Sequence, residues 1–321
     1  MKKTTKIVVV GSLNIDFVVR GPRLPVAGET VSHARFETSL GGKGGNQAVA
    51  VARLGVPTAM VAKTGDDAFG QRLRSSLRAA GVRTSAVRRA RGIPSGVAFV
   101  LTGPGGENQI VVAPGANSAL SKADIDDGVR VLLRSAALVL AQLEVPPAPI
   151  ARLAELVARQ GVPLILDPAP ARPLSNSLLR RVRVLTPNET EACVLCGREP
   201  CRLTFKAARR LCRQLLGRGP GTVILTLGER GALVAERGRE MVYVPGFRVK
   251  AVDTTGAGDA FNGALAVGLL EGKTLVEATR LACAAAALSV TRPGAQPSMP
   301  TRAELRAFLR RHARAGKPRK I

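Results

Sequence analysis

The segment "DTTGAGDAFNGAL" (253–265) combines residue types that suit the transfer of a charged group. Gly256, Ala257 and Gly258 stand directly before a small-residue helical pattern. Such small residues leave backbone amides open at a helix start, where they stabilise negative charge that develops on a transferred phosphoryl group. Asp259 follows at once. We interpret it as a base that accepts a proton from an attacking hydroxyl, with an ordinary helix N-cap as the alternative.

A second glycine-rich segment, "GGKGGN" (41–46), precedes another helical pattern. Its glycines, Gly42 among them, allow the backbone to approach a ligand closely. We expect the helix to begin at about Asn46, so that its free amides favour an anion or hydroxyl oxygens, with Lys43 as a further donor. The spacing differs from that of a Walker phosphate loop. A purely structural glycine turn is the alternative reading.

Two loops are candidates for a monovalent cation site. Asp253 and Thr255 precede the open amides of residues 256–258, which we call the anion hole. The segment "TRPGAQPS" (291–298) forms a second Gly/Pro loop after a helical pattern. A carboxylate, a hydroxyl and backbone carbonyls from these loops could surround the cation. Further polar segments, "AQLE" (141–144) and "DPAPAR" (167–172), follow predicted strands. In an open α/β sheet, ligands bind beyond the carboxyl ends of the strands.

The elements that must position these segments alternate between strands and helices. Continuous apolar runs such as "KIVVVGSL" (6–13), "TAMVAKTG" (58–65) and "GTVILTLG" (221–228) alternate with amphipathic helical patterns. Strands of this kind indicate an α/β fold, a doubly wound and mainly parallel sheet with helices on both faces. The alternation in "FRVKAV" (247–252) predicts one more strand before the anion hole.

Two stretches depart from this rhythm and predict a small antiparallel β lid, formed by about 16–42 and 95–113. The second stretch has the pattern of a hairpin with "GPGGEN" (103–108) as its turn. Such an appendage suits a lid, a dimer surface or both. We expect one domain over residues 1–313 and a basic C-terminal tail over 314–321.

The net charge of +25 raises the question of a nucleic-acid partner. Arginines are scattered over helical patterns without the interleaved aromatic residues or motifs of known nucleic-acid-binding modules, so we expect a solvated basic surface and no specific nucleic acid. No apolar run approaches the ~18 residues of a membrane span, and the N-terminal apolar run is too short for a signal peptide. We therefore expect a cytoplasmic protein without a membrane partner.

The cysteines leave two readings open. Four of them have the spacing C-x2-C-x4-C-x10-C from Cys193 to Cys212. A metal site must be weighed, but "NETEACVLCG" (188–197) has the pattern of a short helix that makes Cys193 and Cys196 ordinary helical positions. We expect packed or surface thiols, with a metal site as the alternative.

Taken together, the motifs resemble those of the ribokinase-like carbohydrate kinase family. Both signatures are present, "GGKGGNQAVAVARLG" (41–55) and "DTTGAGDAFNGAL", and "TPNETEA" (186–192), "LTLGERG" (225–231) and "TRPGAQPS" stand in the family's order. The resemblance runs from about residue 5 to 310, and "GGKGGN" with "GSLNID" (11–16) favours the ribokinase branch.

The resemblance implies a role for each matching position. Sugar hydroxyls are assigned to Asn14, Asp16, Gly42, Lys43, Asn46 and Glu144. Catalysis is assigned to the base Asp259 and the anion hole of Gly256, Ala257 and Gly258. The adenine nucleotide with its phosphates and Mg²⁺ is assigned to Asn188, Glu191, Thr226, Gly228, Gly231, Gly258 and Cys283. Potassium is assigned to Asp253, Thr255, Ser289, Arg292, Gly294 and Ser298, several of them through backbone carbonyls.

The implied activity is an ATP-dependent sugar kinase that converts D-ribose to ribose 5-phosphate. ATP and D-ribose are the implied partners, Mg²⁺ and K⁺ the cofactors, and a homodimer through the lid the implied assembly. Deoxyribose, a nucleoside or fructose is an alternative acceptor. A sugar- or nucleotide-binding regulator without catalysis and a nucleic-acid-binding protein are alternatives from other classes.

Overall fold

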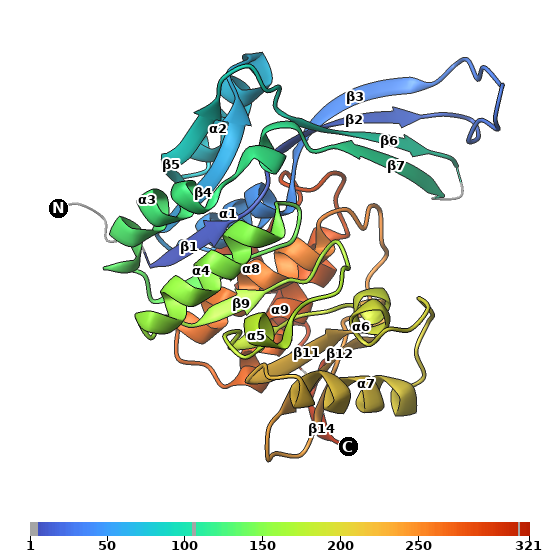
Figure 1. Ribbon diagram of the computed structural model, residues 1–321. Coiled ribbons are helices and arrows are strands. Elements are labelled where there is room, and N and C mark those ends of the chain that lie inside the picture. Colours follow the sequence, from blue (N-terminus) through green and yellow to red (C-terminus); the bar gives the residue numbers. More distant parts are fainter. Residues whose placement is uncertain (1–5, 105–106, 314) are drawn as a thin grey trace.

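A ten-stranded sheet forms the centre of the computed structural model, which describes residues 6–104, 107–313 and 315–321 (Figure 1). From β14 at one edge to β5 at the other, the order is β14-β13-β12-β11-β10-β9-β8-β1-β4-β5. In chain order these strands are β1 (Ile7–Val10), β4 (Thr58–Gly65), β5 (Arg83–Ala90), β8 (Leu138–Ala141), β9 (Leu164–Leu166), β10 (Val184–Leu185), β11 (Thr222–Thr226), β12 (Gly231–Glu236), β13 (Val242–Pro245) and β14 (Arg319–Lys320). The strands from β5 to β11 pair in parallel, and β12 to β14 add an antiparallel edge.

Helices cover both faces of this sheet, as the continuous apolar strands predict. One face packs against α3 (Lys122–Leu133), α4 (Pro147–Arg159), α5 (Asn176–Leu179), α6 (Glu189–Leu195) and α7 (Phe205–Gly217). The other packs against α1 (Lys43–Arg53), α2 (Ala68–Ala79), α8 (Ala257–Leu270), α9 (Leu275–Ser289) and α10 (Arg302–Arg311). Within β1, Val8 and Val10 enter the first core while Ile7 and Val9 enter the second. The predicted doubly wound α/β fold is confirmed.

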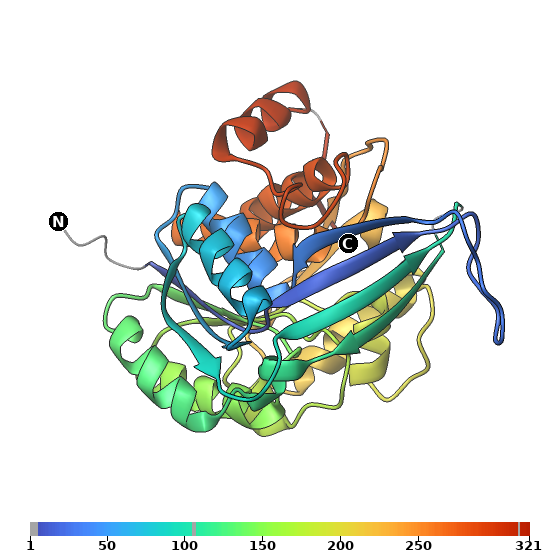
Figure 2. The same ribbon diagram turned by 90° about the horizontal axis from the view of Figure 1, so that it is seen from above.

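A second sheet of four strands projects from one end of the main body (Figures 1 and 2). Its order is β3 (Arg35–Gly41), β2 (Asn14–Arg20), β6 (Gly96–Thr102) and β7 (Asn108–Ala113). The predicted antiparallel pairing is confirmed for the outer pairs β2–β3 and β6–β7, whereas the central pair β2–β6 is parallel. The parallel pairing arises because the chain returns to the main sheet through α1, β4, α2 and β5 before β6 begins. Part of the predicted hairpin turn, 105–106, lies outside the described residues.

Three local predictions differ from the structure. The helix after "GGKGGN" begins at Lys43 rather than at about Asn46. Its first turn lies so close to the β1–β2 connection that a Cβ on Gly44 would stand 2.7 Å from the backbone of Gly11 and Ser12. Gly44 therefore allows close packing inside the helix rather than a turn before it.

The other two differences concern the C-terminal third. Residues 247–252 do not form the predicted strand, because the amides of Val252 and Asp253 turn to the Val290 carbonyl at the end of α9, at 2.7 and 3.2 Å. Within the expected basic tail, Arg319–Lys320 form the edge strand β14, which pairs with β13. Among the described residues, no helix is both long and apolar enough to cross a membrane.

Candidate active site

The residues predicted to bind the sugar and to catalyse the transfer gather where the strand order changes direction. β1 pairs with β4 on one side and with β8 on the other, so consecutive crossovers leave β1 in opposite directions. Ligands of open α/β sheets bind beyond the carboxyl ends of strands at such a switch point. The N-terminal turns of α1 and α8 meet here, and the helices approach so closely that a Cβ on Gly263 would stand 2.6 Å from the Cβ of Ala50.

Asp259 lies in the first turn of α8, only 3% exposed. The N-cap of this helix is Gly256, at φ 75°, so the alternative reading of Asp259 as an N-cap does not describe the structure. Its carboxylate accepts hydrogen bonds from Asn46 Nδ2 at 2.8 Å and from Gln47 Nε2 at 3.1 Å. Burial raises the pKa of Asp259, while the Lys43 ammonium and these two amides oppose the rise. A raised pKa makes the ionised carboxylate a stronger base.

The amides of the predicted anion hole are not equivalent. The Ala257 amide donates to the Thr254 carbonyl at 3.2 Å. Gly258 and Asp259 occupy positions at which a helix provides no intrahelical acceptor for the N–H group. Gly258 is exposed, and an ideal Cβ there would meet nothing within 4 Å, so a ligand can approach this residue closely. The helix-start donors free for an anion are therefore those of Gly258 and Asp259 rather than that of Ala257.

Two glutamines and an aspartate that the sequence analysis did not single out form a hydrogen-bond network with the Asp259 carboxylate. Gln47 donates through the same amide nitrogen to Asp259 and, at 2.9 Å, to Asp167. Gln142 Nε2 donates to Gln47 Oε1 at 2.5 Å, which fixes the orientation of the Gln47 amide. Gln47 belongs to the first signature, and Gln142 and Asp167 lie in the "AQLE" and "DPAPAR" segments. The sequence indicated Gln142 and Asp167 only by their position directly after predicted strands. No regular spacing predicts that they contact Gln47.

Lys43 carries the positive charge of this cluster. Burial alone would lower the pKa of its ammonium, but the carboxylates of Asp259, Asp167 and Glu144 raise it above its ordinary value. Glu144 Oε2 accepts from the Lys43 amide at 2.9 Å and from the Ser12 hydroxyl at 2.5 Å. The first turn of α1 is thus attached to the strand ends of β1 and β8, as the predicted convergence of these motifs requires.

The small sheet brings Asn14 and Asp16 to the same cluster. Asn117, a fully buried residue that the sequence analysis did not identify, donates to Asn14 Oδ1 at 2.7 Å. Asn117 also accepts from the Leu13 amide at 2.9 Å and donates to the Leu13 carbonyl at 3.1 Å. Gly42, at φ 82°, passes so near that a Cβ would lie 2.7 Å from the Asn14 nitrogen. Asn14 is therefore held in one orientation.

Burial, together with the nearby carboxylates of Glu144 and Asp259, raises the pKa of Asp16 to about 7. Asn46 Oδ1 is buried and accepts no hydrogen bond from any described residue. Polar groups in this state favour hydroxyl partners, because a buried acceptor without a donor carries a desolvation cost. The cluster around Asp16 and Asn46 is suited to a small polyol.

Most of the predicted nucleotide residues lie at or just after the ends of β10 and β11. Asn188 is the N-cap of α6, and it forms a capping box with Glu191 in which both hydrogen bonds are 2.8 Å. Burial raises the pKa of Glu191. Thr226 at the end of β11 pairs with Asn188 in a parallel bridge, and Gly228 and Gly231 flank the following turn with positive φ. Capping explains Asn188 locally, and its contact with phosphate or Mg²⁺ stays a prediction.

Cys283 occupies a different environment. It lies on α9, is 7% exposed, and packs in the apolar core on that face of the sheet. Burial raises the pKa of its thiol to about 12. Its assignment to the nucleotide stays a prediction.

The two loops proposed for potassium do meet. Asp253 Oδ1 accepts from the Thr255 amide at 2.9 Å and its hydroxyl at 2.6 Å, and Asp253 Oδ2 accepts from the Gly294 amide at 2.9 Å. Burial acts to raise the pKa of Asp253, but these hydrogen bonds lower it below its usual range, so the carboxylate is ionised. Arg292 forms an ion pair with Glu304 at 2.7 Å, which leaves its backbone as the group available to a cation.

The side chains of the remaining predicted cation residues are also engaged. Ser289 Oγ donates to the Ala286 carbonyl and Ser298 Oγ to the Ala295 carbonyl, both at 2.8 Å. These two serines would therefore contact a cation either through hydroxyl oxygens that already donate a hydrogen bond or through their backbone carbonyls. Among the residues that the structure describes, no three His, Cys, Asp or Glu side chains are placed to hold a metal ion.

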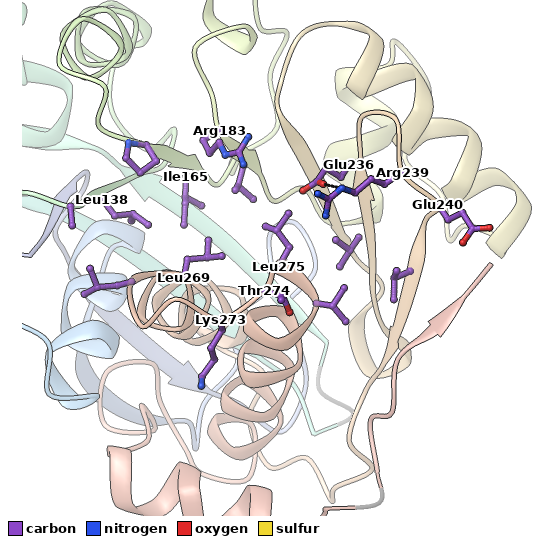
Figure 3. A pocket seen from close by; sticks show the side chains of 17 residues that line it. Leu138, Ile165, Arg183, Glu236, Arg239, Glu240, Leu269, Lys273, Thr274 and Leu275 are labelled. Carbon is purple, nitrogen blue, oxygen red and sulfur yellow. Dashed lines mark ion pairs between the residues drawn. The ribbon is translucent and has the colours of Figure 1, made fainter.

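A cavity of about 510 Å³ lies away from this cluster, at the amino ends of β8, β9 and β10 (Figure 3). Apolar side chains such as Leu138, Ile165, Leu269 and Leu275 form most of its lining, with Arg183 and the Glu236–Arg239 ion pair at its rim. It contains none of the predicted site residues. The predicted site residues lie instead around the carboxyl ends of the strands and the N-terminal turns of α1 and α8.

Comparison with known proteins identifies the family. Residues 4–302 match the model of the pfkB family of carbohydrate kinases. The chain is 39% identical to the ribokinase of Haemophilus influenzae over 96% of its length and 99% of that protein. It is 37% identical to the deoxyribokinase of Salmonella typhi over 94% of its length and 98% of that protein.

A solved structure of Arabidopsis thaliana ribokinase with ribose and ATP superposes with a TM-score of 0.86. The two chains are 37% identical, and the match covers 95% of this chain and 99% of that one. The chain belongs to the pfkB family of carbohydrate kinases, and the resemblance found in its motifs is confirmed.

The raised pKa of Asp16 predicts a pH-dependent stability. An aspartate with a folded-state pKa near 7 holds a proton that the unfolded chain releases near pH 4, so its contribution to the free energy of unfolding falls as pH rises from about 4 to 7. Because Asn does not titrate, the Asp16→Asn variant does not lose this contribution to its free energy of unfolding as the pH rises. The melting temperature of the variant relative to wild type should therefore be more favourable at pH 8 than at pH 5.

Calorimetry without sugar measures the difference at both pH values. Asp66→Asn is the control, because Asp66 is exposed on the surface. A melting-temperature difference for Asp16→Asn that is the same at pH 5 and pH 8 contradicts the prediction.

Proposed function

We propose that this chain is an ATP-dependent kinase that phosphorylates the 5-hydroxyl of D-ribose and yields ribose 5-phosphate and ADP. One observation carries the proposal: a buried carboxylate, Asp259, stands beside free helix-start amides and next to a cluster of polar side chains suited to hydrogen bonds with a small polyol. The match to curated ribokinases over nearly the whole chain supports the same acceptor. Membership of the carbohydrate kinase family supports phosphoryl transfer, and the polar cluster around Asp16 and Asn46 supports a sugar as the acceptor.

In this mechanism, Asp259 orients the primary hydroxyl of the sugar and takes its proton as the new O–P bond forms. Asn46 and Gln47 hold the carboxylate, and Gln142 holds Gln47, so the base needs little reorganisation during the reaction. Proton transfer comes late in a loose phosphoryl-transfer transition state, so an aspartate is a sufficient base.

Charge on the transferred group is stabilised by the start of α8. The free Gly258 and Asp259 amides would donate to the equatorial phosphoryl oxygens as these gain negative charge. Lys43 keeps the surrounding carboxylates from repelling the phosphate. Mg²⁺ bound with ATP would neutralise phosphate charge, and Asn188 and Glu191 are the residues assigned to organise it. The small sheet, acting as a lid, excludes water that would otherwise hydrolyse ATP.

The acceptor is tested by ADP release against a panel of sugars and nucleosides. We expect D-ribose to give the highest kcat/KM, because Asn14, Asp16 and Asn46 present hydrogen-bonding groups rather than an aromatic platform for a base. Deoxyribose is the second candidate, since a deoxyribokinase is among the relatives. Another acceptor that exceeds ribose by about tenfold, or ~1.4 kcal/mol of transition-state binding, contradicts the assignment.

The base is tested by Asp259→Asn, which preserves shape but removes the proton acceptor. We expect kcat to fall by at least about a hundredfold while ribose and ATP still bind and the melting temperature stays near wild type. Thr274→Ala provides the contrast, because Thr274 is a true N-cap of α9 that accepts from the Glu277 amide at 3.2 Å and lies away from the candidate site. That variant should lose about 0.5–2 kcal/mol of stability with little loss of kcat. If Asp259→Asn retains a third of wild-type kcat, Asp259 is not the base.

We further propose that K⁺ binds between the Asp253 loop and residues 289–298 and orders the neighbouring anion hole. The support is the ionised Asp253 carboxylate, which already joins both loops through Thr255 and Gly294. Turnover with MgATP should be higher in K⁺ than in Na⁺ or a bulky organic cation at constant ionic strength. Asp253→Ala should lose this preference. Equal wild-type rates in all three salts would rule out activation by potassium.

A homodimer through the small sheet is proposed from the alternation of its side chains. Asn14 and Asp16 lie on one face, while the registers place Phe17, Phe99 and Val111 on the other. Phe17 stacks on Phe99 with 5.3 Å between ring centroids, yet Phe99 is 50% and Val111 is 68% exposed. Exposed apolar patches of this kind mark interfaces, and a second copy would cover the patch with an identical one.

Phe99→Asp tests the dimer. The variant should sediment or scatter as a monomer at a concentration at which the wild type is dimeric, because a charge would be buried in the apolar interface. Val131→Asp is the control, since Val131 is 64% exposed on α3, outside this sheet. A monomeric wild type, or a Phe99→Asp variant that remains dimeric, contradicts the proposal.

A further inference from the structure

Two thiols that the phosphoryl transfer does not use lie next to each other at the end of α6. Cys193 on this helix is 1% exposed, and Cys201 lies in the following loop at the surface. Their sulfur atoms are 3.9 Å apart. Cys196 is half-buried in the last turn of the same helical segment, and Cys212 is buried in α7. The pair thus combines one accessible thiol with one protected thiol.

The loop that carries Cys201 is attached to α6 at both ends. The Arg198 amide donates to the Cys193 carbonyl at 2.9 Å. At the other end, Glu189 Oε1 accepts from the Leu203 amide at 2.6 Å. Arg230 fastens the same end, because it donates to Glu189 Oε1 at 2.6 Å and to the Leu203 carbonyl at 2.9 Å. The proximity of the two sulfurs is therefore a property of the backbone and not of one mobile side chain.

We propose that Cys193 and Cys201 are a modification site, a dithiol that hydrogen peroxide closes to an intrachain disulfide and a thiol reductant reopens. The accessible Cys201 thiolate attacks one peroxide oxygen, which breaks the O–O bond and gives a sulfenic acid and hydroxide. Cys193 sulfur then attacks the Cys201 sulfur, the S–S bond forms, and the leaving hydroxide takes up the Cys193 proton as water. In total, two thiols and one peroxide give one disulfide and two waters.

The environments of the two sulfurs fit this order. Burial raises the pKa of the Cys193 thiol, which keeps it protonated and slow toward peroxide in solution. Cys201 is exposed and meets the oxidant first. The sulfurs must approach from 3.9 Å to about 2.0 Å, a change that side-chain rotation and a small loop shift can supply while both ends of the loop stay attached.

Closure has a path to the nucleotide side of the proposed active site. Arg230 lies in the short turn between Gly228 and Gly231, the segment assigned to the adenine nucleotide, and it holds the Cys201 loop directly. A shift of this loop toward α6 therefore acts on that turn. This step rests on the proposed function: the disulfide should raise KM for ATP by at least about twofold and leave KM for ribose unchanged.

The bond is tested on the full chain by peroxide treatment, alkylation and tryptic mass mapping. Cleavage after Arg183, Arg198 and Arg202 places Cys193 in peptide 184–198 and Cys201 in peptide 199–202. We expect these peptides to be joined with the loss of two hydrogens and to separate after reduction. Because Cys196 shares the longer peptide, Cys196→Ser should retain the link, whereas Cys193→Ser and Cys201→Ser should lose it.

Several results would overturn the proposal. These are the absence of a joined peptide, a link that persists in Cys193→Ser, or two copies of peptide 199–202 joined to each other, which indicates a bond between chains. Mass mapping needs no activity, so it decides the disulfide even if the acceptor is not ribose. Oxidised wild type with an unchanged KM for ATP, measured beside peroxide-treated Cys201→Ser, would overturn the coupling to the nucleotide.

Discussion

The geometry of the candidate site depends on one buried interaction, in which side-chain amides from α1 hold the carboxylate at the start of α8. Asn46 and Gln47 donate to Asp259, and this contact requires the two helices to pack almost backbone to backbone. Ala50 and Gly263 allow that approach, because a Cβ on Gly263 would overlap Ala50. The same packing fixes where the free amides of α8 point. A single helix pair thus positions both the proposed base and the proposed anion hole.

Burying the Asp259 carboxylate at this helix contact has an electrostatic cost, and neighbouring charged groups raise or lower it. Asp167, Glu144 and Asp16 bring further negative charge to the same region, and burial raises the pKa of Asp259, Asp167 and Asp16. Lys43 provides the opposing charge, and its own pKa rises in response. The Gln47 amide separates Asp259 from Asp167 by donating to both. Such a cluster is tolerated where function needs it and is otherwise unfavourable in a buried site.

The small sheet illustrates how one element serves two surfaces. Because successive side chains of a strand point to opposite faces, β2 presents Asn14 and Asp16 to the site and Phe17 to the outside. In the proposed homodimer, a contact on the outer face would act on the inner face through the shared strands. The alternation would then link the proposed assembly to the proposed sugar site without any residue that belongs to both.

The sequence by itself determined the features that are encoded locally. Continuous apolar runs identified strands covered on both faces, and the small residues around Asp259 indicated an anion hole, because backbone access depends on neighbouring side chains. The two signatures together identified the kinase family. Local pattern was insufficient where tertiary contacts redirected the chain, as at 247–252 and in the first turn of α1.

The tertiary structure alone decided which distant side chains meet. Asn46 and Asp259 are 213 positions apart, and Asn117 and Asn14 are 103 apart. The partners Gln142, Asp167 and Asn117 carry no recognisable spacing, since their proximity arises from strand order and from the parallel pairing of β2 with β6. The Cys193–Cys201 pair likewise depends on a loop fastened by Glu189 and Arg230. Strand pairing between distant segments depends on the whole fold. Each long-range contact becomes favourable only after other contacts have already brought the intervening chain together.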